Sequence, residues 1–313
     1  MRQTENSIVH PQAYEIDEVF AFLVQCDLAE YGEPDASRED LENEWQEVDL
    51  TQDAWIGRDQ AGKICGYGVV TRNEDRLVQD VYIDPGQTPA GVEDELISLC
   101  VRRVEEWLTA APTAEPPQLI GYVTSVSQRL QAAYERADFA RHTYHYRMQI
   151  DLPAPLTLPD WPATYQVSAY KPEDEDELYH FIQTSFDWPG HTDQPFDSWR
   201  SLIFRGGRFD PQLFFLVRQN AKLVGAALTY DEEQGGWIRQ LAVSKEQRGS
   251  GLGSLLLKHV FAVYSQRGRS NVALGVASVN ATAYQFYERN GMNRKREFIE
   301  YRKAMLKSSQ SKD

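Results

Sequence analysis

The chain has 313 residues, of which 42% are hydrophobic and 25% charged, and its formal net charge is −15. This composition is ordinary for a globular protein, and the length is sufficient for two domains. The acidic balance argues against a nucleic-acid partner, and no apolar run approaches the length of a membrane span, so we expect neither as a partner.

The first half of the chain alternates stretches of helical and strand periodicity. Apolar residues recur at helical spacing in four segments: 16–29, 37–45, 92–107 and 128–137. Residues that favour strands dominate five shorter segments: 54–58, 64–70, 77–83, 119–123 and 143–150. Ser37 is placed to cap the second helix. The pattern predicts a mixed α/β unit.

A proline-rich segment, 151–162, follows and contains four prolines. Proline fixes φ and lacks a backbone N–H, so this segment can form neither a helix nor a central strand. We interpret it as an interdomain linker. The prediction is therefore an N-terminal domain over residues 1–150 and a C-terminal domain over residues 163–313.

The second half repeats the first. Three pairs of segments match in the same order: 55–66 with 215–225, 81–83 with 241–243, and 134–139 with 287–292. Chance matching of amphipathic segments is the alternative, but three ordered matches make it a poor one. The sequence therefore predicts two copies of one fold.

The stretch from Leu241 to Leu257 passes from the end of a strand through a glycine-rich turn, 248–253, into a helix. Backbone N–H groups and the positive end of the helix dipole meet at such a turn, glycine permits close approach, and Arg248 adds a positive charge. This pattern favours a phosphate-binding turn. A dinucleotide fingerprint would need glycine in place of Ser254, and a Walker A loop would need Gly-Lys-Ser/Thr, so neither fits. A tight turn that merely contains glycines stays an alternative.

A second motif lies downstream. Residues 280–292 read Asn-x-x-Ala-x-x-Phe-Tyr-Glu-x-x-Gly-Met, which predicts a short helix that stops at Gly291. Together with Leu-x-Val at 241–243 and Arg-x-x-Gly-x-Gly at 248–253, this order of motifs resembles the GNAT N-acetyltransferase family. The resemblance runs from about residue 213 to residue 304. It implies two tandem mixed α/β domains, each a central mixed β-sheet flanked by helices, as in mycothiol synthase-like two-domain acetyltransferases, whose C-terminal copy is the active one.

The two copies differ where the resemblance places the cofactor. Opposite the glycine-rich turn, residues 88–93 replace the arginine by Thr88, the first glycine by Pro89 and the last glycine by Glu93. Thr88 lacks the positive charge of arginine, and Pro89 lacks a backbone N–H donor. Glu93 prevents the close approach of the backbone to a phosphate and adds a negative charge that repels it. We therefore expect a degenerate N-terminal GNAT-like domain and a catalytic C-terminal GNAT domain.

The resemblance also implies roles for individual residues, with acetyl-CoA as the acyl donor. It assigns cofactor binding to Leu241, Ala242, Val243, Arg248, Gly249, Ser250, Gly251, Leu252, Gly253, Ser254 and Asn280. Tyr287 would lie near the thioester sulphur, where a phenol with a pKa of about 10 can protonate the leaving thiolate. A core tyrosine on a helix face is the alternative, because Tyr134 occupies the matching position in the first copy.

The general base is left open. The strand before the turn, 237–243, contains no acidic residue. Asp187 and His191 lie on a segment expected to border the acceptor pocket, and histidine has a suitable intrinsic pKa. A chain of water molecules without a dedicated base is equally compatible with the sequence.

These observations give one predicted function with alternatives. We expect an enzyme that transfers an acetyl group to a primary amine of a small molecule. Another acyl-CoA donor, a protein N-terminus as acceptor, and a CoA-binding sensor without turnover are the alternatives. Three widely spaced cysteines favour reduced thiols over disulfides or a metal site, and the start of the chain has no apolar signal core, so we expect a cytoplasmic monomer or homodimer without a metal.

Overall fold

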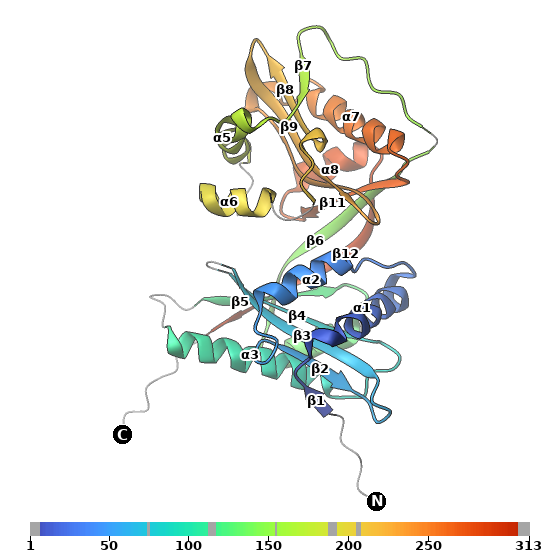
Figure 1. Cartoon of the computed structure of the whole chain (residues 1–313), viewed down its shortest axis with the longest axis vertical. Coiled ribbons are helices and arrows are strands. Elements are labelled where there is room, and N and C mark those ends of the chain that lie inside the picture. The colour runs from blue at the N-terminus through green and yellow to red at the C-terminus, as the bar shows by residue number, and fades with distance from the viewer. Residues whose placement is uncertain are drawn as a thin grey trace, which may run out of the picture. The chain divides into compact units, whose positions relative to one another are not determined.

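A computed structural model describes the chain over residues 7–73, 76–111, 117–153, 155–186, 193–204 and 208–305. The chain divides into two compact units (Figure 1). Unit 1 comprises Met1–Tyr144 and Arg296–Asp313, and unit 2 comprises His145–Lys295. No helix among the described residues is long and apolar enough to cross a membrane.

Unit 1 is built on a mixed sheet whose strands follow the order β1-β2-β3-β4-β5-β12. Its strands before the last are β1 (Ser7–Val9), β2 (Ala54–Arg58), β3 (Ile64–Asn73), β4 (Arg76–Ile83) and β5 (Gln118–Thr124). Its helices are α1 (Ile16–Tyr31), α2 (Arg38–Glu47), α3 (Val92–Ala110) and α4 (Gln128–Arg136). Neighbouring strands are antiparallel except β4 and β5, which are parallel.

Unit 2 repeats this plan, and its strands follow the order β6-β11-β10-β9-β8-β7. The strands after β6 are β7 (Gln166–Ala169), β8 (Phe214–Gln219), β9 (Lys222–Glu232), β10 (Gly235–Val243) and β11 (Asn271–Ala277). The helices are α5 (Glu175–Ser185), α6 (Phe196–Ile203), α7 (Leu252–Gln266) and α8 (Ala281–Arg289). Here β10 and β11 form the parallel pair.

Two strands run from one unit into the other. β6 (Ala140–Asp151) pairs with β11 of unit 2 through its residues from His145 onward, and β12 (Asn293–Ala304) pairs with β5 of unit 1 from Phe298 onward. The boundaries therefore differ from the predicted 1–150 and 163–313. β6 directly follows the first part of unit 1 in the sequence but completes the sheet of unit 2, and β12 follows unit 2 but completes the sheet of unit 1. Local periodicity cannot show which sheet a strand joins.

The proline-rich segment 151–162 also differs from its interpretation as an interdomain linker, because it lies within unit 2. The Leu152 N–H donates to the Ser270 carbonyl at 2.7 Å, and the Leu156 N–H donates to the Ser265 hydroxyl at 3.0 Å. The Trp161 indole N–H contacts His259 Nδ1 on α7 at 3.3 Å. After Asp151, the described residues of the segment form neither a helix nor a strand, as predicted, and its non-proline residues fix it to the surface around α7.

Matching elements of the two units share backbone details as well as order. The long helices α3 and α7 both begin after a glycine in the left-handed conformation, with φ of 90° at Gly91 and 91° at Gly251. The short helices α4 and α8 are both followed by a left-handed residue, Asp138 at φ 62° and Gly291 at φ 89°. The repeat predicted from the sequence is therefore confirmed at the level of individual turns.

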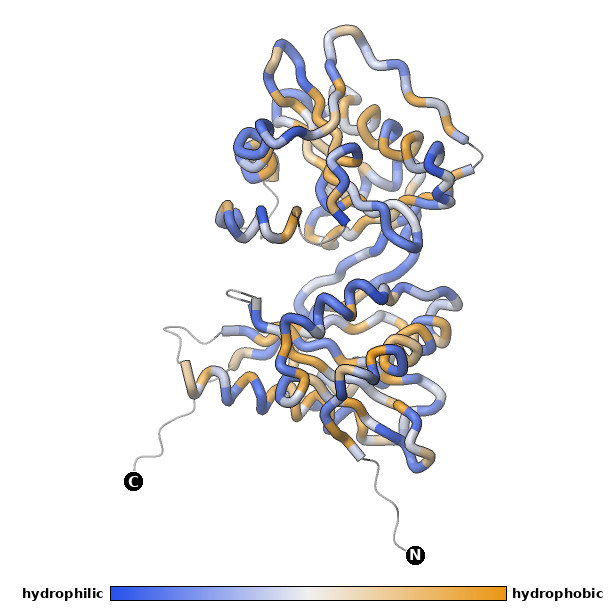
Figure 2. Tube along the Cα trace, in the orientation of Figure 1, coloured by the Kyte–Doolittle hydropathy of each residue, from blue (hydrophilic) through white to orange (hydrophobic). Residues whose placement is uncertain are grey.

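Each unit has its own hydrophobic core beneath its long helix. The apolar residues of α3 pack on strands of unit 1, and those of α7 pack on strands of unit 2. Figure 2 shows the corresponding alternation of apolar and polar residues along these helices. The packed face fixes where the N-terminus of each helix lies relative to its sheet.

Candidate cofactor and active site

The parallel pair in unit 2 separates partway along its length. Only Gly236, Trp237 and Ile238 of β10, all within the described part of the chain, pair with β11. A register shift between Ile238 and Gln240 marks a bulge at Arg239. Beyond it β10 stays paired with β9 but no longer with β11. The backbone edge of 240–243 is therefore open on the β11 side.

Backbone direction identifies which groups face this opening. The Ser244 N–H donates to the Val224 carbonyl on β9 at 2.9 Å. Successive N–H groups of an extended strand point to opposite edges. The N–H groups of Val243 and Leu241 therefore point toward the opening, whereas the Ala242 N–H points toward β9.

The glycine-rich turn places unsatisfied donors just beyond the end of β10. Among the described residues, the backbone N–H groups of Gly249, Gly251, Gly253 and Ser254 have no hydrogen-bond acceptor. The Leu252 N–H is an exception, because it donates to the Ser250 hydroxyl at 3.3 Å. The N-terminus of α7 has no capping side chain and no acidic residue in its first turn. An anion at this position would meet free donors and the positive end of the helix dipole.

Gly253 brings the turn, the strand and the downstream motif together. A Cβ atom at Gly253 would lie 3.3 Å from the Phe286 ring on α8 and 3.5 Å from the Val243 side chain on β10. The backbone of α7 therefore approaches both elements more closely than a side chain comfortably allows. This contact explains the third glycine of the motif and places the strand, the turn and the downstream helix together.

Arg248 connects the glycine-rich turn to α5. Its guanidinium Nη2 donates to the Ser185 carbonyl at the end of α5, at 2.7 Å. Its charge is thus tied to the end of α5, beside the turn.

Asn280 has a structural role in addition to the one implied by the resemblance. Its side-chain Oδ1 accepts a hydrogen bond from the Ala283 N–H at 3.2 Å and so caps α8. That acceptor is occupied, so the amide NH₂ is the group with donor capacity for a ligand.

Tyr287 projects from α8 into the core of unit 2. It packs with Leu252 and Val276 and is 9% exposed. Burial raises its pKa to about 12, so the phenol is protonated at neutral pH. Among the described residues, no hydrogen-bond partner of its hydroxyl is found.

The structure does not test the two candidate general bases. Asp187 and His191 lie outside the described residues. On β10, the residue next to the bulge is Gln240, whose Oε1 accepts a hydrogen bond from the Trp199 indole at 3.2 Å. The sequence does not predict this contact, because no local pattern links α6 to the middle of β10.

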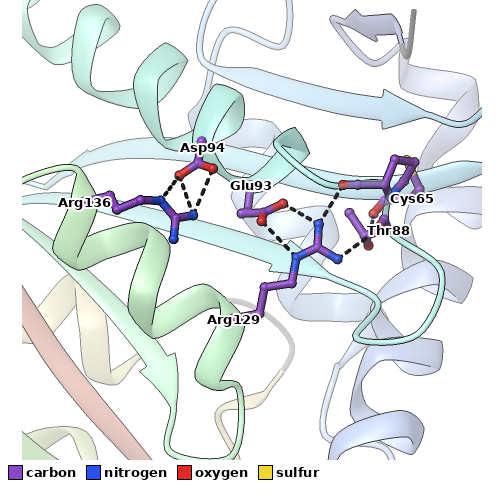
Figure 3. Close-up of polar contacts among 7 residues, drawn as sticks. Cys65, Thr88, Glu93, Asp94, Arg129 and Arg136 are labelled. Carbon is purple, nitrogen blue, oxygen red and sulfur yellow. Dashed lines mark hydrogen bonds and ion pairs between the residues drawn. The ribbon is translucent and has the colours of Figure 1, made fainter. Parts of the chain in front are cut away.

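The corresponding turn of unit 1 is closed by side chains (Figure 3). Arg129, on α4, donates to the Thr88 and Pro89 carbonyls, both at 2.6 Å. The same guanidinium binds the Glu93 carboxylate through two hydrogen bonds of 2.8 and 2.5 Å. Burial opposes ionisation of Glu93, but the hydrogen bonds and charge of Arg129 hold its pKa below the ordinary value.

The first turn of α3 therefore differs in charge from that of α7. It contains Glu93, Asp94 and Glu95, whereas α7 contains no acid there. Asp94 is paired with Arg136 at 2.7 Å (Figure 3). The positive end of the α3 dipole is thus already matched by carboxylates of the protein itself.

Comparisons with known proteins agree with this geometry. Residues 175–292 match the Acetyltransferase (GNAT) family. Mycothiol acetyltransferase from Thermobispora bispora is 28% identical over 167 residues, which are 50% of this chain and 56% of that protein. The chain thus matches little more than half the length of that relative. The [Ribosomal protein bS18]-alanine N-acetyltransferase of Escherichia coli K12 is 27% identical over 127 residues, 41% of this chain and 80% of that protein.

A solved structure matches both units at once. The GCN5-related N-acetyltransferase from Sphaerobacter thermophilus superposes with a TM-score of 0.83 at 26% identity, covering 97% of this chain and 98% of that one. The tandem arrangement is therefore common to both proteins. Acetyl-CoA is the acetyl donor of the GNAT acetyltransferases. The match to the Acetyltransferase (GNAT) family thus lies entirely within unit 2, the second of two units that share one fold.

Proposed function

We propose that unit 2 binds acetyl-CoA at the glycine-rich turn and transfers its acetyl group to a primary amine of a small molecule. The observation that carries this proposal is the set of free N–H groups at Gly249, Gly251 and Gly253, at the mouth of an opening between two parallel strands. A pyrophosphate satisfies such donors, and the open β10 edge can pair with the amides of a pantetheine arm.

The thioester carbonyl would lie beside the N–H groups that point into the opening. A donor fixed by the strand, at Leu241 or Val243, needs no reorganisation when negative charge develops on the carbonyl oxygen. Loss of one such donor in an acyl-transfer enzyme typically costs on the order of a hundredfold or more in rate. The position of the bulge therefore has a chemical consequence, because it releases this edge from β11.

Tyr287 is proposed to stabilise and protonate the leaving thiolate. Its pKa of about 12 lies roughly 3.5 units above that of an ordinary thiol, so complete proton transfer from the unliganded state would cost about 5 kcal/mol. Donation of a hydrogen bond to the developing thiolate is the step that this environment favours. The proton follows once the attacking amine has released its own, which leaves an amide, a thiol and the tyrosine in its starting state.

Amine acceptors of two kinds are supported by the relatives. One relative is named for mycothiol and the other for an alanine of a ribosomal protein. The small-molecule acceptor is preferred because the match to the former spans half of this chain and the tandem fold is present. A protein N-terminus is the second candidate, and the two are separated by the same assay.

The three cysteines indicate the cellular compartment in which the protein works. Cys26, Cys65 and Cys100 are all buried and free, as expected for a protein that works among reduced thiols. We propose that the protein acts in the cytoplasm as a monomer or homodimer. Sedimentation of the purified chain measures the second point directly.

The test of function is release of free thiol from acetyl-CoA in the presence of candidate amines. A panel of small primary amines and short peptides with free N-termini should show turnover with small amines, and Tyr287→Phe should reduce that turnover. Turnover with peptides alone would assign the second candidate. Tight binding of acetyl-CoA without any amine-dependent thiol release would identify a sensor and refute the enzymatic proposal.

A further inference from the structure

Unit 1 contains a cavity of about 270 Å³ at the position that the open strand edge occupies in unit 2. β4 pairs with β5 only through Leu77, Val78 and Gln79, as β10 pairs with β11 through three residues of the described chain. The next residues of β4, 80–83, line the cavity with parts of α1, α2 and β5. The first copy has therefore kept the strand opening although its phosphate turn is closed.

The lining of the cavity is strongly acidic. Six carboxylates contribute to it: Asp27, Glu30, Asp35, Asp40, Glu44 and Asp80. None of the described residues that line it is basic. The nearby Arg296, 3% exposed, binds Asp27 at 2.9 Å and approaches Asp35 at 3.8 Å. Acidic side chains therefore outnumber basic ones in the described lining of the cavity, six to none.

For two of these acids, burial in the cavity disfavours the charged form. Glu44 accepts a hydrogen bond from the Tyr67 hydroxyl at 2.7 Å, and burial, followed by the charge of Asp80, raises its pKa to about 8. The Asp80 carboxylate makes no hydrogen bond or ion pair with any described residue, and its half-buried side chain lines the cavity. Burial alone raises the pKa of Asp80 to about 6. An enclosed carboxylate without a partner is destabilising unless a ligand compensates it.

The arrangement fits an extended organic cation better than a metal ion. Among the described residues, no three acidic, histidine or cysteine side chains converge closely enough to hold a metal. The remaining lining is aromatic and aliphatic, provided by Tyr67, Tyr82, Tyr122, Leu23, Leu41, Val81, Ile83, Leu130 and Phe298. Separated carboxylates with apolar surface between them match ammonium groups joined by methylene chains.

We propose that this cavity in unit 1 binds a linear di- or polyamine, with ammonium groups at Asp80 and Glu44 and methylene groups along the apolar lining. The site is for binding and not for acetyl transfer. The ion pair of Glu93 and Arg129 fills the turn where a cofactor phosphate would have to lie. The inference does not depend on the function of unit 2.

The test is calorimetry of the full chain with spermidine at low ionic strength and pH 7.5. The wild-type chain should bind spermidine, and 1,4-butanediol, which lacks the charges, should give no heat. Asp80→Asn and Glu44→Gln should each weaken binding by tenfold or more. Glu42→Gln is the matched control, because Glu42 is exposed on the same helix and does not line the cavity.

A stability measurement separates a binding role from a structural one. Asp80→Asn removes an unpaired enclosed charge, so it should raise the melting temperature of the free protein while weakening spermidine binding. A structural role for Asp80 would lower the melting temperature instead. The proposal is wrong if wild-type chain gives no heat with spermidine, if both variants bind it as tightly as wild type, or if Mg²⁺ alone binds this cavity and excludes spermidine.

Discussion

Substitution of Gly251 tests the cofactor site most sharply. Two different substitutions there separate the cost of backbone strain from the effect of an added charge. Its φ of 91° is strained for any other residue, and a Cβ there would meet no atom within 4 Å. Gly251→Asn and Gly251→Asp therefore share about 1–2 kcal/mol of backbone strain and differ mainly in one charge. A carboxylate roughly 5 Å from a phosphate charge costs about 3 kcal/mol at an effective dielectric constant near 20. Acetyl-CoA affinity should fall about a hundredfold further in the aspartate variant than in the asparagine variant.

Calorimetry with acetyl-CoA measures both affinities, and unit 1 supplies the internal control. Gly91 has the same position before α3, with φ of 90° and no atom within 4 Å of a Cβ. Gly91→Asp carries the same strain and the same charge in the other copy, and it should leave acetyl-CoA affinity unchanged. Equal affinities for the asparagine and aspartate variants at position 251 would show that no phosphate lies at this turn.

Three further predictions follow from side chains in the two units. Tyr287→Phe should keep acetyl-CoA affinity and lower turnover by roughly a hundredfold in a thiol-release assay, and full activity would assign the proton to another donor. Glu93→Gln should leave turnover unaltered but lower the unfolding free energy by about 1–3 kcal/mol, since it removes the carboxylate charge that binds Arg129 through two hydrogen bonds. Asp94→Asn, at an exposed pair, should cost under about 1 kcal/mol, and similar losses for the two variants in denaturant titrations would contradict the distinction. The raised pKa of Asp80 means that the folded state binds more protons than the unfolded state between about pH 4 and pH 6, so this residue makes stability fall as pH rises through that window. Asp80→Asn should flatten that part of the pH profile, and an unchanged slope would refute the assignment.

The sequence predicts the local turns well, because each turn requires a backbone conformation or a close approach that a glycine or asparagine in the sequence indicates. The glycines at 249 and 251 mark left-handed conformations and Gly253 marks one close contact, and the residue order alone is enough to locate all three. The stop of α8 at Gly291 is of the same kind. Such signals depend on a few consecutive residues, so no distant partner is needed to interpret them.

Features that depend on distant partners could not be predicted in this way. Nothing local in β12 shows that it pairs with β5, more than 170 residues earlier, so the predicted domain boundaries differ from the observed ones. The sequence alone presents Glu93 as a charge that repels phosphate, whereas the structure pairs it with Arg129 from another helix. The acidic cavity of unit 1 has no local signature, because its carboxylates come from α1, α2 and β4 and the segment between α1 and α2.

The stoichiometry of acetyl-CoA binding tests the central claim most directly. Titration of the full chain with acetyl-CoA in a calorimeter should give one site per chain, because α7 combines free N–H groups with a first turn that lacks acids, whereas the first turn of α3 contains three acids. The single site should be lost in Gly251→Asp and kept in Gly91→Asp. Two equivalent sites per wild-type chain would contradict the account and show that unit 1 binds the cofactor despite Glu93 and Arg129.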